Sequence, residues 1–203
     1  MPNGLSAMPK LSPQISFLLR GSGLLIGLLT IWWFALLDPM LYGLRSAASL
    51  FVGIEERSSG DWGVRVTLDA AIPATDERAQ SQKVGSIDFD MSRSDAIAFT
   101  FSVPVFWAIV LAAPGQILRR LRPLLLGTVA MALIEVLLLL VFAQVTARNL
   151  LAQSYGIESA AGVWGRRLCE YLVVNVLPYV VPFVVAVCID RQLSRAVTAQ
   201  LHV

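Results

Sequence analysis

Residues 119–145 read RRLRPLLLGTVAMALIEVLLLLVFAQV, and this stretch decides the class of protein. Arg119, Arg120 and Arg122 precede a run of about 20 apolar residues, which would reach roughly 30 Å as a helix, the thickness of a bilayer's hydrocarbon core. A water-soluble helix of that length would show a polar face, and this run has none. We therefore predict a membrane span with Glu135 near its centre.

The composition of the whole chain indicates a multi-pass membrane protein. Of the 203 residues, 56% are hydrophobic and 15% are charged, whereas soluble domains have about 25% charged residues. The net charge of +2 is too small to favour a nucleic-acid partner. No Gly-rich phosphate loop, HExxH or CxxC motif occurs, so we expect no cofactor and no metal site. The expected partners are membrane lipids and another membrane protein.

Four apolar runs predict a mainly α membrane protein with four transmembrane helices. A small extracytoplasmic insertion, an amphipathic helix plus a β-hairpin, separates the first two spans. The expected parts are a cytoplasmic tail (1–16), the first span (17–37), the extracytoplasmic segment (38–96), the second span (97–113), a cytoplasmic Arg loop (114–122), the third span (123–145), an extracytoplasmic loop (146–171), the fourth span (172–189) and a cytoplasmic tail (190–203).

The first apolar run favours a retained span over a cleaved signal peptide, because it is longer than the usual apolar region of 7 to 15 residues. Arg20 can reach the headgroups from one turn inside the span, and Trp32 and Trp33 suit the opposite interface. Gly23 and Gly27 form a GxxxG pattern, which can let two membrane helices approach closely.

The insertion after the first span combines helical and β patterns. Residues 40–53 have apolar side chains at helical spacing, which predicts an amphipathic helix on or leaving the membrane surface. Residues 62–72 and 84–91 alternate apolar and polar side chains, which predicts two strands joined by the polar link 73–83. Because two strands alone are marginal in water, we expect them to lean on the helix, the membrane or a partner.

Proline and glycine set the expected shape of the later segments. Pro104 interrupts the short second span, and Pro114-Gly115 turns the chain toward the Arg loop. Residues 146–171 are polar and punctuated by glycines, which predicts a connection that lies along the interface. Pro178 and Pro182 are expected to bend the last span.

Basic residues near the spans favour an orientation with both termini in the cytoplasm of a bacterium, and hence a location in the inner membrane. The side carrying the termini would then hold a dense set of basic residues close to the spans: Lys10, Arg20, Arg119, Arg120, Arg122, Arg191 and Arg195. The long connections hold more basic residues in total, but long segments cross the membrane with little regard to charge.

Glu135 is the sharpest candidate for a functional residue, because a charge at mid-bilayer costs at least about 2.5 to 3.5 kcal/mol on insertion scales. We expect it to be neutral, paired or facing a polar cavity. Its possible partners are Thr128, Gln144, Asn175 or an arginine of another protein. The carboxyl either orders the bundle through a local hydrogen bond or serves as a functional or partner-docking site.

Catalytic chemistry has little support in the sequence. Arg166 and Arg167 could activate Cys169, but His202 lies in the tail on the opposite side, so no base is at hand. We therefore predict that the protein is not an enzyme, and treat Arg148, Arg166 and Arg167 as candidate partner contacts. Cys169 and Cys188 would lie roughly 28 Å apart along a helix, too far for a disulfide.

Several segments share their layout with a known family. They are Phe17-Leu-Leu-Arg20, Leu37-Asp-Pro39, the strand-like segment 64–91, the proline-containing span from Ser102 to Pro114, the turn Arg120-Leu-Arg122-Pro-Leu-Leu-Leu-Gly127 and Val176-Leu-Pro178-Tyr-Val-Val-Pro182. Together they resemble the exosortase-associated membrane proteins, in particular the family associated with exosortase H.

This resemblance implies an accessory role beside an exosortase, a membrane enzyme that processes a C-terminal sorting tail on exported proteins. Such enzymes resemble thiol transpeptidases that use Cys, Arg and His, a set that this chain lacks. The implied partner is the enzyme or its tailed substrates. The alternative is a subunit of a transport or envelope-assembly complex in which Glu135 is a functional carboxylate. A third alternative is an enzyme that uses Cys169.

Overall fold

The computed structural model describes residues 13–72, 82–113, 117–155, 160–190 and 194. In its first half the elements are α1 (Pro13–Ile31), the π-helix η1 (Trp32–Leu36), α2 (Leu37–Ala48), β1 (Gly53–Glu56), β2 (Trp62–Ile72) and β3 (Gln82–Met91). They are followed by α3 (Arg93–Thr100), α4 (Ser102–Ala112), α5 (Ile117–Tyr155), α6 (Ala160–Tyr171), the π-helix η2 (Leu172–Val176) and α7 (Leu177–Ile189). The predicted turn at Pro114-Gly115, the strand link 73–81 and most of both tails lie outside the described residues.

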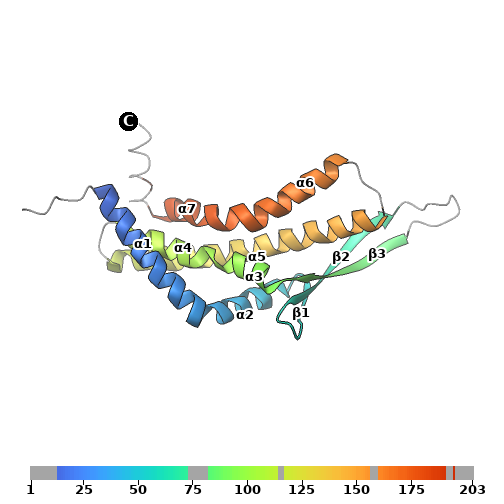
Figure 1. Cartoon of the computed structure of the whole chain (residues 1–203), viewed down its shortest axis with the longest axis horizontal. Coiled ribbons are helices and arrows are strands. Elements are labelled where there is room, and N and C mark those ends of the chain that lie inside the picture. The colour runs from blue at the N-terminus through green and yellow to red at the C-terminus, as the bar shows by residue number, and fades with distance from the viewer. Residues whose placement is uncertain (1–12, 73–81, 114–116, 156–159, 191–193, 195–203) are drawn as a thin grey trace, which may run out of the picture.

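Within the described residues, four helical segments are long and apolar enough to cross a membrane, which confirms a multi-pass membrane protein. They are Leu19–Ala48, Arg93–Ala112, Arg120–Ser154 and Gly162–Ile189. Figure 1 shows the beginning of α1 and the end of α7 at one end of the long axis, which we call the terminal end. The three strands, the end of α5 and the beginning of α6 lie toward the other end, the sheet end.

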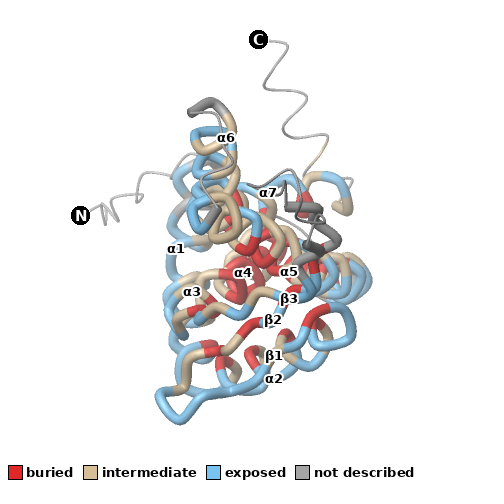
Figure 2. The backbone as a smooth tube through the Cα atoms, turned by 90° about the vertical axis from the view of Figure 1, so that its right-hand side faces the viewer, coloured by how far each residue is buried: buried red, intermediate tan, exposed pale blue. Residues whose placement is uncertain are grey.

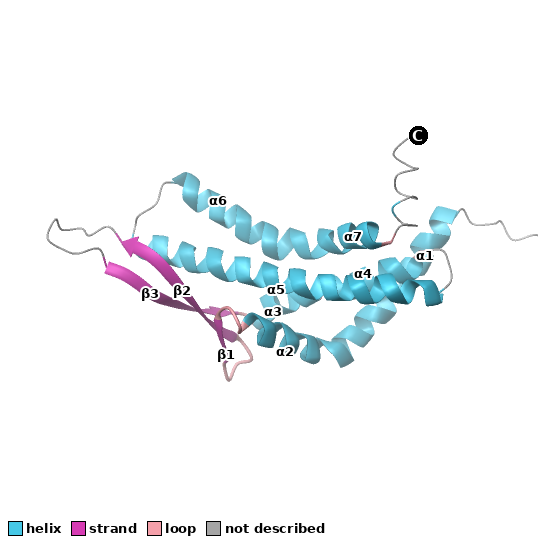
Figure 3. Ribbon diagram, turned by 180° about the vertical axis from the view of Figure 1, so that it is seen from behind, coloured by secondary structure: helices cyan, strands magenta, loops and turns pink. Residues whose placement is uncertain are grey.

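Helix α5 is the axis of the structure (Figures 1 and 3). Its 39 residues give a length of roughly 58 Å, about twice the thickness of a hydrocarbon core. Its continuation to Tyr155, and helix α6 after it, correct the prediction of an irregular connection over 146–171. Gly162 and Gly165 lie within α6, which contacts α5 and continues directly into η2.

The second span is made of two helices that meet at Phe101. Ser92 caps the first of them, because its hydroxyl accepts a hydrogen bond from the backbone N–H of Asp95 at 3.2 Å. Pro104 lies in the first turn of α4 and has no N–H to donate to the carbonyl of Thr100, so the regular helix is interrupted at Phe101, three residues before the proline. The helix also begins at Arg93, earlier than the predicted residue 97.

The insertion forms a three-stranded antiparallel sheet in the order β1-β2-β3. The alternation that predicted β2 is confirmed, since Val64 and Val66 are buried whereas Arg65 and Thr67 are exposed. The prediction missed β1, whose four residues pair Gly53 with Arg65 at one end of the strand.

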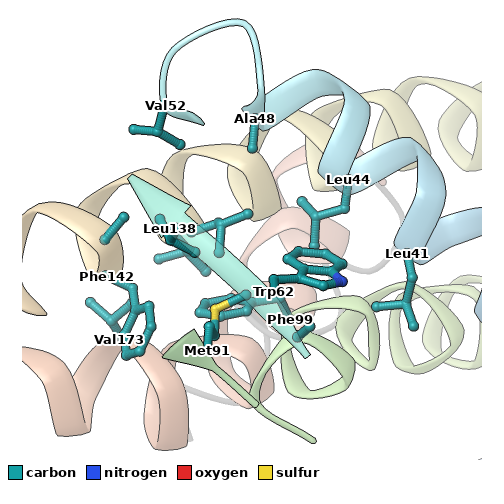
Figure 4. Packing of buried hydrophobic residues seen from close by; sticks show 14 of the residues in the cluster. Leu41, Leu44, Ala48, Val52, Trp62, Met91, Phe99, Leu138, Phe142 and Val173 are labelled. Atoms are coloured by element: carbon teal, nitrogen blue, oxygen red, sulfur yellow. The ribbon is translucent and has the colours of Figure 1, made fainter. Parts of the chain in front are cut away.

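The sheet and α2 pack against the C-terminal half of α5 in one apolar cluster (Figure 4). Leu41, Leu44 and Ala48 of α2 are buried there, together with Trp62 of β2 and Leu138 of α5. The apolar face of α2 is therefore turned to protein and not to the membrane surface. Figure 2 shows buried residues toward the middle of the molecule and exposed residues on the outer sides of the helices around them. A second cluster joins α4, α5 and α7 around Phe106 and Met131.

Candidate functional site

Glu135 lies in α5 and is buried, with 4% of its surface exposed. Its carboxyl contacts the hydroxyl of Ser102 at 2.5 Å, at the start of α4. The same hydroxyl donates to the backbone carbonyl of Phe99 at 3.2 Å. The partner of Glu135 is therefore Ser102, which corrects the expectation of Thr128, Gln144 or Asn175.

The number of hydrogens on Ser102 and Glu135 decides whether both contacts of the Ser102 hydroxyl can be hydrogen bonds. The Ser102 hydroxyl carries one hydrogen but lies between two acceptors, the Phe99 carbonyl and the Glu135 carboxyl. Both contacts become hydrogen bonds if Glu135 carries a proton and donates it to the Ser102 oxygen. We infer a chain of hydrogen bonds from Glu135 through Ser102 to Phe99, with a neutral side chain at mid-span.

The other predicted partners of Glu135 have different roles. The hydroxyl of Thr128 donates to the carbonyl of Leu124 at 2.7 Å and accepts from the indole N–H of Trp107 at 2.8 Å. Asn175 lies in η2 and is exposed. The sequence could not assign Ser102, because its proximity to Glu135 depends on how α4 packs against α5.

The three candidate arginines differ in burial. Arg166 is half-buried and its Nε donates to Asn149 Oδ1 at 2.6 Å, while Asn149 donates to Glu170 Oε2 at 3.3 Å. This network joins α5 to α6. Arg148 and Arg167 are exposed, so they remain candidate partner contacts.

Arg120 has a structural contact that the sequence did not reveal. It is 7% exposed, and its Nη1 donates to the carbonyls of Leu111 at 2.5 Å and Val110 at 3.2 Å. These carbonyls belong to the last turn of α4, where a helix leaves its C=O groups unpaired and carries partial negative charge. Arg120 thus caps α4 from the beginning of α5.

We expect Arg120→Ala to lower the free energy of unfolding by about 1–3 kcal/mol, because it removes the charged donor from buried carbonyls. Thermal unfolding of the purified protein in detergent measures this effect. Arg122→Ala is the matched control, since Arg122 is exposed two residues away. Equal melting temperatures for the two variants would contradict the capping role.

The glycines of the predicted GxxxG face make no close packing contact within the described chain. A Cβ added at Gly23 or Gly27 would meet no other atom within 4 Å. Gly127 of α5 behaves differently, because a Cβ there would overlap the ring of Phe106 on α4. Among the described glycines, Gly127 is therefore one that permits a close approach of two helices, α4 and α5.

The solvent face of the sheet carries paired charges. Arg65 donates to both carboxyl oxygens of Asp88, at 2.8 Å and 3.1 Å, and these hydrogen bonds lower the pKa of Asp88. Arg57 pairs with Asp90 at 2.7 Å. The two ion pairs together carry no net charge.

Neither cysteine forms a disulfide, since Cys169 and Cys188 are both free. Within the part of the chain that the structure describes, no three His, Cys, Asp or Glu side chains gather closely enough to hold a metal ion.

A family model described as "Exosortase H-associated membrane protein" matches residues 11–193. No curated protein and no solved structure matches the chain. The match spans all four apolar helical segments and the sheet.

Proposed function

The chain belongs to the family of exosortase H-associated membrane proteins, and we propose that it is a non-enzymatic accessory protein that binds an exosortase-type enzyme in a bacterial inner membrane. In this proposal both termini are cytoplasmic, and the sheet end faces the extracytoplasmic side, where the sorting tails of exported proteins would be presented.

The observation that supports a partner is an exposed face along α6, η2 and α7. Large side chains recur on it at intervals of three, four or eight residues, and 49% to 74% of the surface of each is exposed: Trp164, Leu168, Tyr171, Tyr179 and Phe183. The face covers about 20 residues, or roughly 30 Å of helix. It is long enough to pack along a whole transmembrane helix of a partner.

Asn175 distinguishes this face from a surface that only contacts lipid. Its exposed amide lies within the apolar span Gly162–Ile189, and no described residue hydrogen-bonds its side chain. Lipid tails cannot satisfy an amide, whereas a polar side chain on a neighbouring helix can. The π-helix around Asn175 is a form often found at functional sites. Arg148 and Arg167, exposed at the sheet end, would add charged groups to the proposed contact there.

We expect the triple variant Trp164→Ala, Leu168→Ala, Asn175→Leu to recover at least tenfold less exosortase-type enzyme than the parent protein in an affinity pull-down from mild detergent. The reason is that central aromatic and polar contacts dominate interface energies. The control is Leu125→Ala with Leu133→Ala, which truncates equally exposed side chains on α5. Equal recovery from the two variants would reject this face.

The accessory role itself has a separate test. A strain that lacks the protein should accumulate unprocessed tailed precursors. Expression of the variant Leu125→Ala with Leu133→Ala in this strain should restore their processing. Normal processing without the protein would contradict the proposed function, whichever face binds the partner.

A further inference from the structure

A charged pocket of about 360 Å³ lies where α2, the turn after β1 and the beginning of α3 meet, a junction visible in Figures 1 and 3. Two ion pairs belong to it. Arg45 of α2 pairs with Glu56 of β1, and Arg93 of α3 pairs with Asp38 of α2 at 2.6 Å. The volume falls in the range of small-molecule sites.

The pocket has an apolar floor and an aromatic wall. Leu41 and Trp62 line it and are buried. Tyr42 is exposed, and its ring lies 5.5 Å from the guanidinium carbon of Arg45. The site therefore offers charged groups, a rigid aromatic surface and an apolar base within one cavity.

The position of Arg93 is fixed by the sheet. Asp61, after β1, accepts a hydrogen bond from the backbone N–H of Arg93 at 3.1 Å. The hydroxyl of Ser59 donates to the same carboxyl, and together these bonds lower the pKa of Asp61. Gly60, with φ of 82°, makes the turn that places these groups beside the pocket.

The length of the neighbouring apolar helix indicates how deep the pocket would lie in a bilayer. Arg93 begins the apolar segment Arg93–Ala112, whose 20 residues correspond to about 30 Å of helix. Arg93 therefore lies about one hydrocarbon thickness from the terminal end, and its ion pair with Asp38 places the pocket at the same level.

An apolar track leads from the pocket into the bilayer region. Phe34 and Ile31 precede Asp38 by about one and two turns, and they are 82% and 54% exposed. A molecule with a charged head in the pocket could lay an apolar chain over these side chains. The geometry of the pocket and the track matches an amphiphile.

The charge balance selects the type of head. The two arginines and two carboxylates sum to no net charge, so the pocket has no excess positive charge to attract a purely anionic group. A group with both a phosphate and an ammonium would find arginines for the first and carboxylates for the second. It would keep the pocket neutral.

We propose that this pocket binds the phosphoethanolamine headgroup of a membrane phospholipid, with an acyl chain along Phe34 and Ile31. The lipid would join α2, the sheet and α3 at the membrane boundary and so hold the sheet end at a fixed height above the bilayer.

The test is native mass spectrometry of the full chain in detergent, with dioleoyl phosphatidylethanolamine or dioleoyl phosphatidylglycerol added at equal concentrations. We expect at least fivefold tighter binding of the ethanolamine lipid. Glu56→Gln leaves the pocket with one excess positive charge, so this variant should reverse the preference toward the glycerol lipid. Asp88→Asn is the matched control, because it removes a similarly exposed acid from the sheet face outside this pocket.

Equal binding of the two lipids, or the same preference in Glu56→Gln and Asp88→Asn, would overturn the proposal. Soluble glycerophosphoethanolamine separates the two sources of this headgroup. If it competes as well as the whole lipid, the acyl track contributes nothing and the assignment to a lipid is wrong. A melting curve for each variant shows whether the fold is kept, and Arg45→Lys, which retains both ion-pair charges, should keep the preference.

Discussion

Replacing Gly127 with alanine should destabilise the helical bundle by about 1–3 kcal/mol, the usual cost of overpacking. Gly127 is buried on α5, and a Cβ at this position would overlap the ring of Phe106 on α4. Phe106 is itself fully buried, so its ring has no open space into which to move. Thermal unfolding in detergent should show a lower melting temperature and a larger aggregated fraction.

Gly27→Ala is the matched control, because a Cβ there meets nothing within 4 Å. Alanine is the better helix former by about 1 kcal/mol, so this variant should be as stable as the parent or more stable. Phe106→Leu should recover part of the loss in Gly127→Ala, since the smaller side chain vacates the volume that the methyl group needs. If Gly127→Ala and Gly27→Ala have the same melting temperature, α4 and α5 do not approach as closely as the structure shows.

Patterns within one segment predicted much of the fold. The apolar runs identified four spans because hydrophobicity over about 20 residues is a local property. The alternation of Val64 and Val66 with Arg65 and Thr67 predicted β2 for the same reason. The prediction missed β1 because four residues are too few to show a clear alternation. This strand is recognised only through its pairing with β2. The prediction also missed helix α6, because its glycines are typical of a loop and its contact with α5 cannot be read from one segment of sequence.

The candidate site was harder to predict, since it depends on contacts between segments. The sequence singled out Glu135 because a carboxyl is rare in an apolar run. It gave no reason to choose Ser102, which lies 33 positions away and meets Glu135 only after α4 packs on α5. Gly127 looked like one small residue among leucines, and its role depends on Phe106. The pocket between Asp38 and Arg93 likewise joins residues 55 positions apart.

Glu135→Gln should keep the stability of the parent within about 0.5 kcal/mol, if the inferred proton lies between Glu135 and Ser102. The glutamine amide can donate to the Ser102 oxygen, and Ser102 can still donate to Phe99. Ser102→Ala should instead cost about 1–3 kcal/mol, because the buried carboxyl loses its partner. Unfolding by heat or denaturant in detergent measures both changes.

The double variant Ser102→Ala, Glu135→Leu completes the test. When both polar groups are removed, no buried carboxyl is left unpaired, so the variant should be more stable than Ser102→Ala alone.

The same variants separate the accessory role from proton-coupled transport. A transport carboxylate must release and rebind its proton, which glutamine cannot do, so Glu135→Gln would abolish that activity while leaving the fold intact. Normal processing of tailed precursors in Glu135→Gln would therefore favour a structural carboxyl. Loss of stability in Glu135→Gln equal to that in Ser102→Ala would instead require a charged Glu135, and would reject the neutral hydrogen-bond chain.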